Sequence, residues 1–394
     1  MLEYTGKYGT AKVMLDTFSD DEAQGTISQI YEFLNHPAFT NPIAIMPDCH
    51  KGKGAVIGFT MKLTDKVIPN VIGVDIGCGM LSANFEHNLF LEMTPEELDE
   101  KIREKIPFST NVHKSKRDFL PTFYEEINTT LVNFCKKFNE EFKTSYKIPS
   151  KVDEEWLKKK CKDIGMDYDR AVNSLGTLGG GNHFIEVGIG EDDNFWITIH
   201  SGSRQLGLKI ANHHQRKAGK GHLAYLEGNE MFDYLIGMVV AQTYAKTNRA
   251  CMLSEIMEIV NFAPFDRISS THNYIDFNDF IIRKGAISSY KKEYMIIPFN
   301  MEDGILLCKG KSNPEWNYSA PHGSGRVASR TWAKQNLSLN EAKERMSNRG
   351  IYCSTMPLDE TKLAYKDPKI IEQAIGPTAE IVNRLKPVLC CKGK

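Results

Sequence analysis

The segment VIPNVIGVDIGCGM, residues 67–80, combines a run of β-branched apolar residues with three glycines. Valine and isoleucine favour strands, and glycine permits tight turns and a close approach of backbone to a ligand. The preceding segment IAIMPDCHKGKGAVIGFTMKL, residues 43–63, has the same texture. The pattern predicts buried strands joined by tight loops, with Asp75 and Cys78 on a turn just after an apolar strand.

Helical patterns surround this strand-rich region. Thr94 followed by Glu97 predicts a capping box, and lysine-rich segments of helical period follow, so we expect a peripheral helical layer over about 94–164. A long helix is expected over about 229–259, and further strands in FWITIH (195–200), MIIPFN (295–300) and GILLCKG (304–310). With 394 residues, 41% of them hydrophobic, and no long linker or internal repeat, the pattern predicts one compact mixed α/β domain over residues 1–394.

Composition restricts the environment of the protein. The formal net charge is -1, so a polyanionic partner would need a local basic patch, because the global field is weak. Nine cysteines are scattered without a compact framework and no apolar leader opens the chain, which favours a reducing cytoplasm. Polar residues interrupt the apolar stretches well before the roughly 20 residues that a bilayer requires, so we expect no membrane span.

Five side chains form a candidate metal site. Asp75 and Cys78 stand at metal-ligand spacing, and His183, His200 and His272 each lie at the edge of a predicted strand. Each histidine taken singly is more often a satisfied polar group than a ligand, and a lone cysteine after a strand is usually a small core residue. Together they suffice for two metal ions if the thiolate bridges. Thiolate and imidazole favour Zn²⁺, whereas the carboxylate favours the harder Mn²⁺.

His322 lies in a different kind of motif, APHGSGR, residues 320–326. The pattern predicts a loop that leads into a helix carrying Arg326 and Arg330 on one face, which would form an anion site. His322 would then be a phosphate ligand, a general acid, a nucleophile or, with equal weight, only a helix cap. We interpret His50 as a group that orients a ligand, and His213 and His214 as part of a solvated basic face.

These motifs resemble the RtcB RNA ligase family. The resemblance rests on MPDCHKGKG, IPNVIGVDIGCGM, LGTLGGGNHFIEVG, IHSGSR, HNY, APHGSGR and the terminal CKGK, in consistent order over most of the chain. It implies a single α/β domain with central sheets packed as a sandwich inside surrounding helices. It also implies a ligase that joins an RNA 3′-phosphate or 2′,3′-cyclic phosphate end to a 5′-hydroxyl end with GTP and two Mn²⁺ ions. Cys78 would bridge the metals and His322 would carry GMP.

The resemblance also implies a nucleotide pocket. Asn182 would contact phosphate, Glu186 the edge of the base, and Lys392 would be ordered from a flexible terminus by the ligand. Gln205 departs from the family pattern and is expected near the metals. GTP use rests on the resemblance, since the chain has no Walker A motif and no lysine-nucleophile signature. The implied pocket comprises Asn182, His183, Phe184, Ile185, Glu186, His272, Asn273, Pro298, Phe299, Asn300, Met301, His322, Gly323, Ser324, Gly325 and Lys392.

Two other classes of function remain open from the sequence. A dinuclear metallo-phosphoesterase acting on nucleotides or RNA ends would use the same five ligands without a covalent histidine. A catalytically silent RNA-binding module would need none of them. For the ligase, the expected partners are tRNA halves or other cleaved RNA and an archease-like activating protein, and we expect a monomer.

Overall fold

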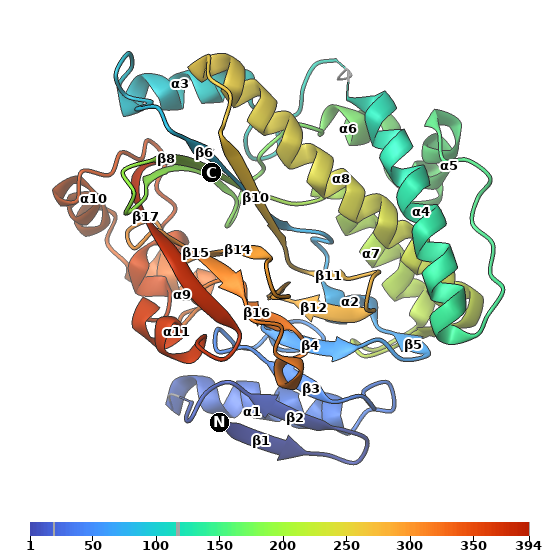
Figure 1. Ribbon diagram of the computed structural model, residues 1–394. Helices are drawn as coiled ribbons and strands as arrows, with labels where there is room; N and C mark the ends of the chain where they lie inside the picture. The colour runs from blue at the N-terminus through green and yellow to red at the C-terminus, as the bar shows by residue number, and fades with distance from the viewer. Residues whose placement is uncertain (19, 116–118, 394) are drawn as a thin grey trace.

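A seven-stranded antiparallel sheet forms the centre of the molecule (Figure 1). The computed structural model describes residues 1–18, 20–115 and 119–393. The sheet nearly closes on itself. Its two edge strands approach each other so closely that the Ser270 hydroxyl on one lies 3.5 Å from the Ile296 carbonyl on the other. In spatial order the strands are β10 (Asp266–Thr271), β6 (Gly79–Phe85), β8 (Phe195–Ser201), β7 (Phe184–Ile189), β17 (Ala379–Lys392), β15 (Ile305–Gly310) and β14 (Tyr294–Pro298).

A six-stranded sheet lies below it in the view of Figure 1. Its β2–β3 pairing is parallel and its other pairings are antiparallel. In order it contains β1 (Leu2–Thr5), β2 (Thr10–Val13), β3 (Ile43–Ile45), β4 (Phe59–Lys62), β12 (Ile281–Lys284) and β11 (Tyr274–Ile275). Two short ribbons pair β13 (Ala286–Ser288) with β16 (Ser319–Pro321), and β5 (Lys66–Val67) with β9 (Leu226–Glu227).

Helices surround the sheets, with α4 to α8 on one side and α9 to α11 on the other (Figure 1). The capping box between Thr94 and Glu97 is confirmed at the start of α3. The predicted long helix is confirmed as α8, which is buried along most of its length. The helices are α1 (Asp20–Leu34), α2 (Pro69–Ile72), α3 (Pro95–Lys105), α4 (Leu120–Phe142), α5 (Glu154–Ile164), α6 (Tyr168–Asn173), α7 (Arg204–Ala218), α8 (Gly228–Val260), α9 (Arg330–Asn336), α10 (Leu339–Asn348) and α11 (Pro368–Ala374).

The strands of the large sheet present different residues on their two faces. Side chains alternate along a strand, so Ile197 and Ile199 of β8 pack on one face with Ile256 of α8, in a fully apolar cluster. His200 and Phe184, which are paired across β8 and β7, lie on the opposite face. Helix α8 therefore covers one face, and the other face carries a second apolar cluster together with polar residues such as His200 and Glu186. Among the described helices, none combines the length and apolar character that a membrane span requires.

The predicted mixed α/β class is confirmed, but three local predictions are wrong. The apolar run before Asp75 forms the short helix α2 and not a strand, because Pro69 opens a helical turn and Gly73, with φ 100°, ends it. Asp75 to Cys78 therefore precede β6 instead of following a strand.

The other two corrections concern basic residues. The loop after His322 leads into a helix as predicted, but α9 begins only at Arg330, so Arg326 is not on it and instead forms an isolated bridge with Tyr365. His214 is buried and does not lie on a solvated face, since α7 turns it against Tyr234 of α8, with ring centroids 5.2 Å apart. Its neighbour His213 is half-buried.

Candidate active site

A cavity of about 330 Å³ opens over the free face of the large sheet, at its border with the six-stranded sheet. Residues from segments far apart in the sequence line it. They are His50, Ile57, Asp75, Cys78, Met80, Asn182, Phe184, Glu186, His200, His272, Asn273, Pro298, Phe299, Asn300, Met301, Gly304, His322, Gly323, Ser324, Gly325, Arg326, Arg330, Glu360, Tyr365, Cys390 and Lys392.

Three buried donors meet at one wall of the cavity. Cys78 Sγ lies 3.2 Å from His200 Nε2 and 3.6 Å from His183 Nε2. The three donor atoms lie within 4.8 Å of one another, a separation that a single metal ion can bridge. This cluster is suited to metal binding.

The backbone fixes the orientation of two of the imidazole rings. His183 Nδ1 lies 3.0 Å from the Leu178 carbonyl, and His200 Nδ1 lies 3.1 Å from the Asn182 carbonyl. A carbonyl only accepts, so each ring carries a proton on Nδ1. His183 Nε2 also faces the Asp75 carboxylate, to which it donates only while the ring is doubly protonated. His200, with its proton on Nδ1 alone, turns the lone pair of Nε2 toward Cys78. This tautomer is the one that a metal ligand requires.

Asp75 and His272 extend this cluster in two directions. Asp75 Oδ2 lies 3.0 Å from His183 Nε2, and its Oδ1 accepts a hydrogen bond from the Ser203 amide at 3.1 Å. On the other side, His272 Nε2 lies 3.3 Å from His200 Nε2. All five predicted metal ligands are thus in one continuous set of contacts.

Burial sets the protonation of the donors. It holds the pKa of His200 and of His272 well below the usual range, so both rings are neutral and can offer a lone pair. Burial also raises the pKa of the Cys78 thiol, which would lose its proton on binding a metal. Burial tends to raise the pKa of Asp75. The hydrogen bond and the charge of a protonated His183 outweigh burial and lower the pKa of Asp75 to about 2.

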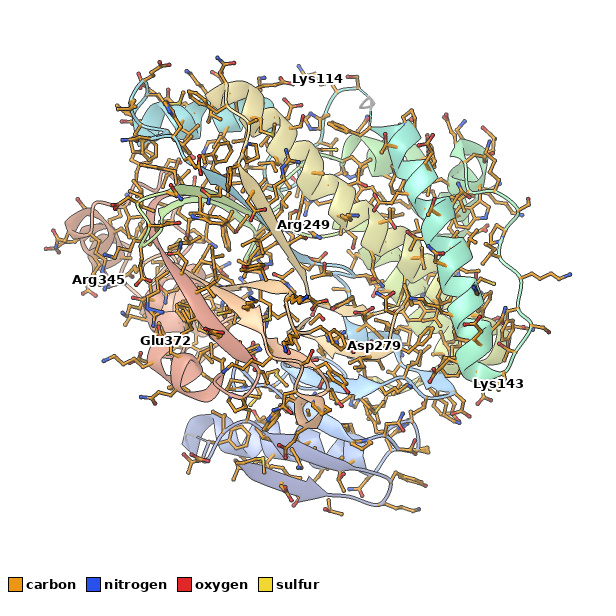
Figure 2. All side chains as sticks on the ribbon, in the orientation of Figure 1. Lys114, Lys143, Arg249, Asp279, Arg345 and Glu372 are labelled. Atoms are coloured by element: carbon orange, nitrogen blue, oxygen red, sulfur yellow. The ribbon has the colours of Figure 1, made fainter. Side chains whose placement is uncertain are left out.

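A buried arginine braces the turns that carry the donors. Arg249, labelled in Figure 2, extends from α8 and is 1% exposed. Its Nη1 donates to the Gly77 carbonyl at 3.0 Å and to the Ser201 carbonyl at 2.8 Å. These carbonyls directly precede and follow the donors Cys78 and His200 in the sequence, so Arg249 holds the two segments in register.

His322 lies beside this cluster and is paired with Asp48. Its Nδ1 is 2.7 Å from Asp48 Oδ2, and its ring centroid is 4.7 Å from that of His272. Asp48 is 0% exposed. A buried carboxylate that accepts from Nδ1 fixes the tautomer and leaves the Nε2 lone pair available for attack.

The other end of the cavity is charged. Lys392 Nζ lies 3.3 Å from Glu360 Oε2, and both side chains are 3% exposed. Burial acts to raise the pKa of Glu360, but Lys392 and Arg330 outweigh it and lower this pKa to about 2. Arg326 and Arg330 both bond the same carboxylate group at Glu360, with Nη1–Oε1 distances of 3.3 and 2.6 Å. These arginines are therefore anchored in an ionic network and do not project from an exposed helix face.

Glu186 faces the cavity with an unused acceptor. Its Oε1 has no hydrogen-bond partner among the described residues, and burial raises the pKa of Glu186 to about 8. A buried carboxyl of this kind is stabilised by a ligand that supplies N–H groups.

Lys392 lies in a strand and not in a flexible segment, contrary to the expectation. This residue is the last of β17 and pairs with Phe184 of β7, and its Nζ lies 5.3 Å from the Phe184 ring centroid. Figure 1 shows β17 as part of the large sheet. Lys392 is ordered by the sheet, since β17 runs between β7 and β15.

Most residues of the predicted nucleotide pocket line the cavity, with two exceptions. His183 lies behind the lining with its ring against Asp75 and Cys78. Ile185 points into the apolar core, because it alternates with Phe184 and Glu186 along β7. Gln205 accepts a hydrogen bond from Arg170 at 3.2 Å and stands two residues after Ser203, whose amide donates to Asp75. His50 lines the cavity with Nδ1 2.9 Å from the Asp48 carbonyl, and burial lowers the pKa of His50 to about 4.

Sequence reasoning missed the role of Asp48, and also Glu360 and Tyr365. Asp48 stands in MPDCHKGKG, a glycine-rich motif already singled out, so its position was a signal, but no spacing connects it with His322. Glu360 and Tyr365 lie in a segment without motif character. They join the site because Arg326 donates to both, at 3.3 Å to Glu360 and 3.2 Å to Tyr365.

Comparisons with known proteins identify relatives over nearly the whole chain. The family model described as tRNA-splicing ligase RtcB matches residues 29–393. The chain is 31% identical over 402 residues to the RNA-splicing ligase RtcB of Escherichia coli K12, covering 93% of each protein. It is 26% identical over 430 residues to the tRNA-splicing ligase RtcB of Aeropyrum pernix, covering 89% of this chain and 87% of that protein.

Proposed function

Because the chain belongs to the RtcB family, we propose that it is an RNA ligase that joins 3′-phosphate or 2′,3′-cyclic phosphate ends to 5′-hydroxyl ends through GMP carried on His322. The observation that carries this proposal is the pairing of His322 with buried Asp48, at 2.7 Å, directly beside the metal-donor cluster. A hydrolase that uses the same donors has no need of a second imidazole activated by its own carboxylate.

We propose that Asp75, Cys78, His183, His200 and His272 would hold two Mn²⁺ ions. Support comes from the donor set itself, in which neutral Nε2 atoms, a thiol and a carboxylate converge and the Nδ1 atoms of His183 and His200 face carbonyls. Thiolate and imidazole also suit Zn²⁺, so the identity of the metal rests on the family. When bound, the ions would neutralise phosphate charge and polarise the phosphoryl group.

The nucleotide would lie between His322 and the charged end of the cavity. Guanine presents N–H donors at N1 and N2, which match the unused acceptor of Glu186, whereas adenine presents no such donor pair. Asn182 and the Gly323–Gly325 loop would contact phosphate, and Phe184, Asn273 and Pro298–Met301 would line the walls. Lys392 would contact the nucleotide from the end of β17.

The proposed chemistry has three transfers. His322 Nε2 attacks the α-phosphorus of GTP, an N–P bond forms, and pyrophosphate leaves. An RNA 3′-phosphate oxygen then attacks the same phosphorus, which frees the imidazole and leaves GMP on the RNA end. Finally the 5′-hydroxyl oxygen attacks the RNA phosphate and GMP leaves, while a cyclic phosphate end is first opened by water. Asp48 holds the Nδ1 proton of His322 throughout.

Labelled GTP tests this function. Incubation with GTP labelled at the α-phosphate, in the presence of Mn²⁺, should leave the label on the protein, and 3′-phosphate RNA should then remove it. ATP labelled in the same way is the control and should transfer little label, because Glu186 finds no matching donors. Hydrolysis of nucleotides or RNA ends with no protein-bound label would instead support a metallo-phosphoesterase.

Asp48→Asn should reduce adduct formation by about 10²- to 10⁴-fold, because the amide no longer selects the tautomer with a free Nε2. The measurement is the rate of label transfer from GTP as a function of pH. Asp276→Asn is a suitable control, since Asp276 is half-buried and pairs with Arg283 outside the cavity. Equal rates for wild type and Asp48→Asn across the pH range would remove Asp48 from the mechanism.

Cleaved RNA, such as tRNA halves, is the substrate class that we propose. The assignment of residues 1–394 to one ligase domain, a cytoplasmic location, an archease-like activator and a monomeric state remain predictions. Copurification with an activating protein, or a mass measured in solution, would test the last two.

A further inference from the structure

Two cysteines outside the metal-donor cluster lie side by side at the charged end of the cavity. Tyr352 and Leu389 form a parallel bridge, so the residues that follow them, Cys353 and Cys390, are neighbours in register. Two backbone hydrogen bonds hold this register, from the Tyr352 amide to the Val388 carbonyl at 2.8 Å and from the Cys390 amide to the Tyr352 carbonyl at 2.9 Å. Neighbouring strand positions have Cα separations within the range that a disulfide spans.

The two side chains pack in the same apolar cluster. Cys353 Sγ donates to the Thr355 carbonyl at 3.0 Å. Their accessibility differs, since Cys353 is half-buried and Cys390 is buried. A reagent can therefore approach Cys353, and Cys390 is the buried neighbour of Cys353.

This pair is connected to the proposed nucleotide pocket on both sides. Cys390 lines the cavity and pairs across the sheet with Glu186, two positions from Lys392. Cys353 lies on the segment that leads to Glu360, the carboxylate partner of Lys392. A change in the separation of the two sulfurs would therefore shift the segments that carry Lys392 and Glu360.

We propose that Cys353 and Cys390 form a reversible disulfide with a small-molecule disulfide such as oxidised glutathione, and that this bond impairs nucleotide binding. The effect on nucleotide binding rests on the proposed function, whereas formation of the disulfide does not. The bond would bring the sulfurs to about 2.05 Å and displace Cys390 and its strand neighbours.

The exchange proceeds in two balanced steps. The Cys353 thiolate attacks one sulfur of the small disulfide, an S–S bond forms, and one small thiolate leaves. Cys390 then gives up its proton and attacks the Cys353 sulfur, which releases the second small thiol. Two protein thiols are oxidised and one small disulfide is reduced to two thiols. The neighbouring Cys390 side chain lowers the pKa of Cys353, against the effect of burial, and the charge of Lys392 also lowers it, which makes Cys353 the attacking group.

The test uses the full-length, metal-loaded protein. After exposure to oxidised glutathione and alkylation, peptide mass spectrometry should find a peptide that joins Cys353 to Cys390. GTP affinity should fall by at least about tenfold, the loss of one hydrogen bond to a charged group, and dithiothreitol should restore it. Cys353→Ser should bind GTP as the wild type does and should resist the oxidant.

Cys135→Ser is the matched control, because Cys135 is also half-buried and donates to a carbonyl, that of Tyr146, at 3.3 Å. This variant should remain sensitive to the oxidant. The proposal is overturned if no cross-linked peptide forms, if the cross-link leaves GTP affinity unchanged, or if Cys353→Ser loses affinity as the wild type does. If the reduced wild type binds no GTP, the proposed function fails, and the mass measurement still decides whether the disulfide exists.

Discussion

His322→Ala is expected to form no covalent adduct with GTP and to lose RNA ligation by about 10⁴-fold or more, the scale of effect seen when an enzyme loses its nucleophile. The variant should still bind two metal ions, because His322 is not one of the five proposed donors and contacts Asp48 through Nδ1. It should also remain folded, since the imidazole is partly exposed and its loss leaves no apolar cavity.

The adduct itself identifies the residue. A bond between imidazole nitrogen and phosphorus should be labile in acid and stable in base, unlike an adduct on a carboxylate or hydroxyl. His36→Ala provides the control, because His36 is half-buried at a site that does not line the cavity. An adduct that persists in His322→Ala, or ligation by that variant at the wild-type rate, would contradict the assignment.

The second large effect is expected for Cys78→Ala, which should lower metal affinity by at least about 100-fold and abolish ligation. Its Sγ lies between the Nε2 atoms of His183 and His200, so both proposed metal positions would lose a ligand. The measurement is metal content after dialysis, together with ligation across a series of Mn²⁺ concentrations.

Cys161→Ala separates this effect from a general effect of losing a buried thiol. Cys161 is also buried, but it lies on α5 in the apolar core and does not line the cavity. It should retain metal and activity. Wild-type activity of Cys78→Ala at the wild-type Mn²⁺ requirement would exclude Cys78 from the site.

Local sequence patterns predicted part of the site and misplaced part of it. They correctly indicated the capping box at Thr94 and the long helix α8, because both depend on residues within a few turns. They failed at α2 and at Arg326, where short apolar or basic runs fit either helix or loop and the surrounding structure decides. His214 was misassigned for the same reason, since burial depends on which face of α7 meets α8.

What the sequence by itself determined is the chemistry available and the face that each strand offers. Strict alternation along β7 and β8 puts Phe184, Glu186 and His200 on one face and isoleucines on the other, because successive side chains point to opposite sides. Glycine-rich turns beside Asp75 and Cys78 likewise follow from local backbone freedom. The identity of the family also came from motifs in order along the chain.

Only the tertiary structure decided which of these groups meet. Asp48 and His322 are 274 residues apart, and their contact depends on the way the glycine-rich loops pack, with Gly325 against the backbone of Asp48. The neighbouring thiols of Cys353 and Cys390 likewise follow from a bridge between a loop and the last strand. Such contacts leave no period or spacing in the sequence, because they are set by the packing of complete elements through space.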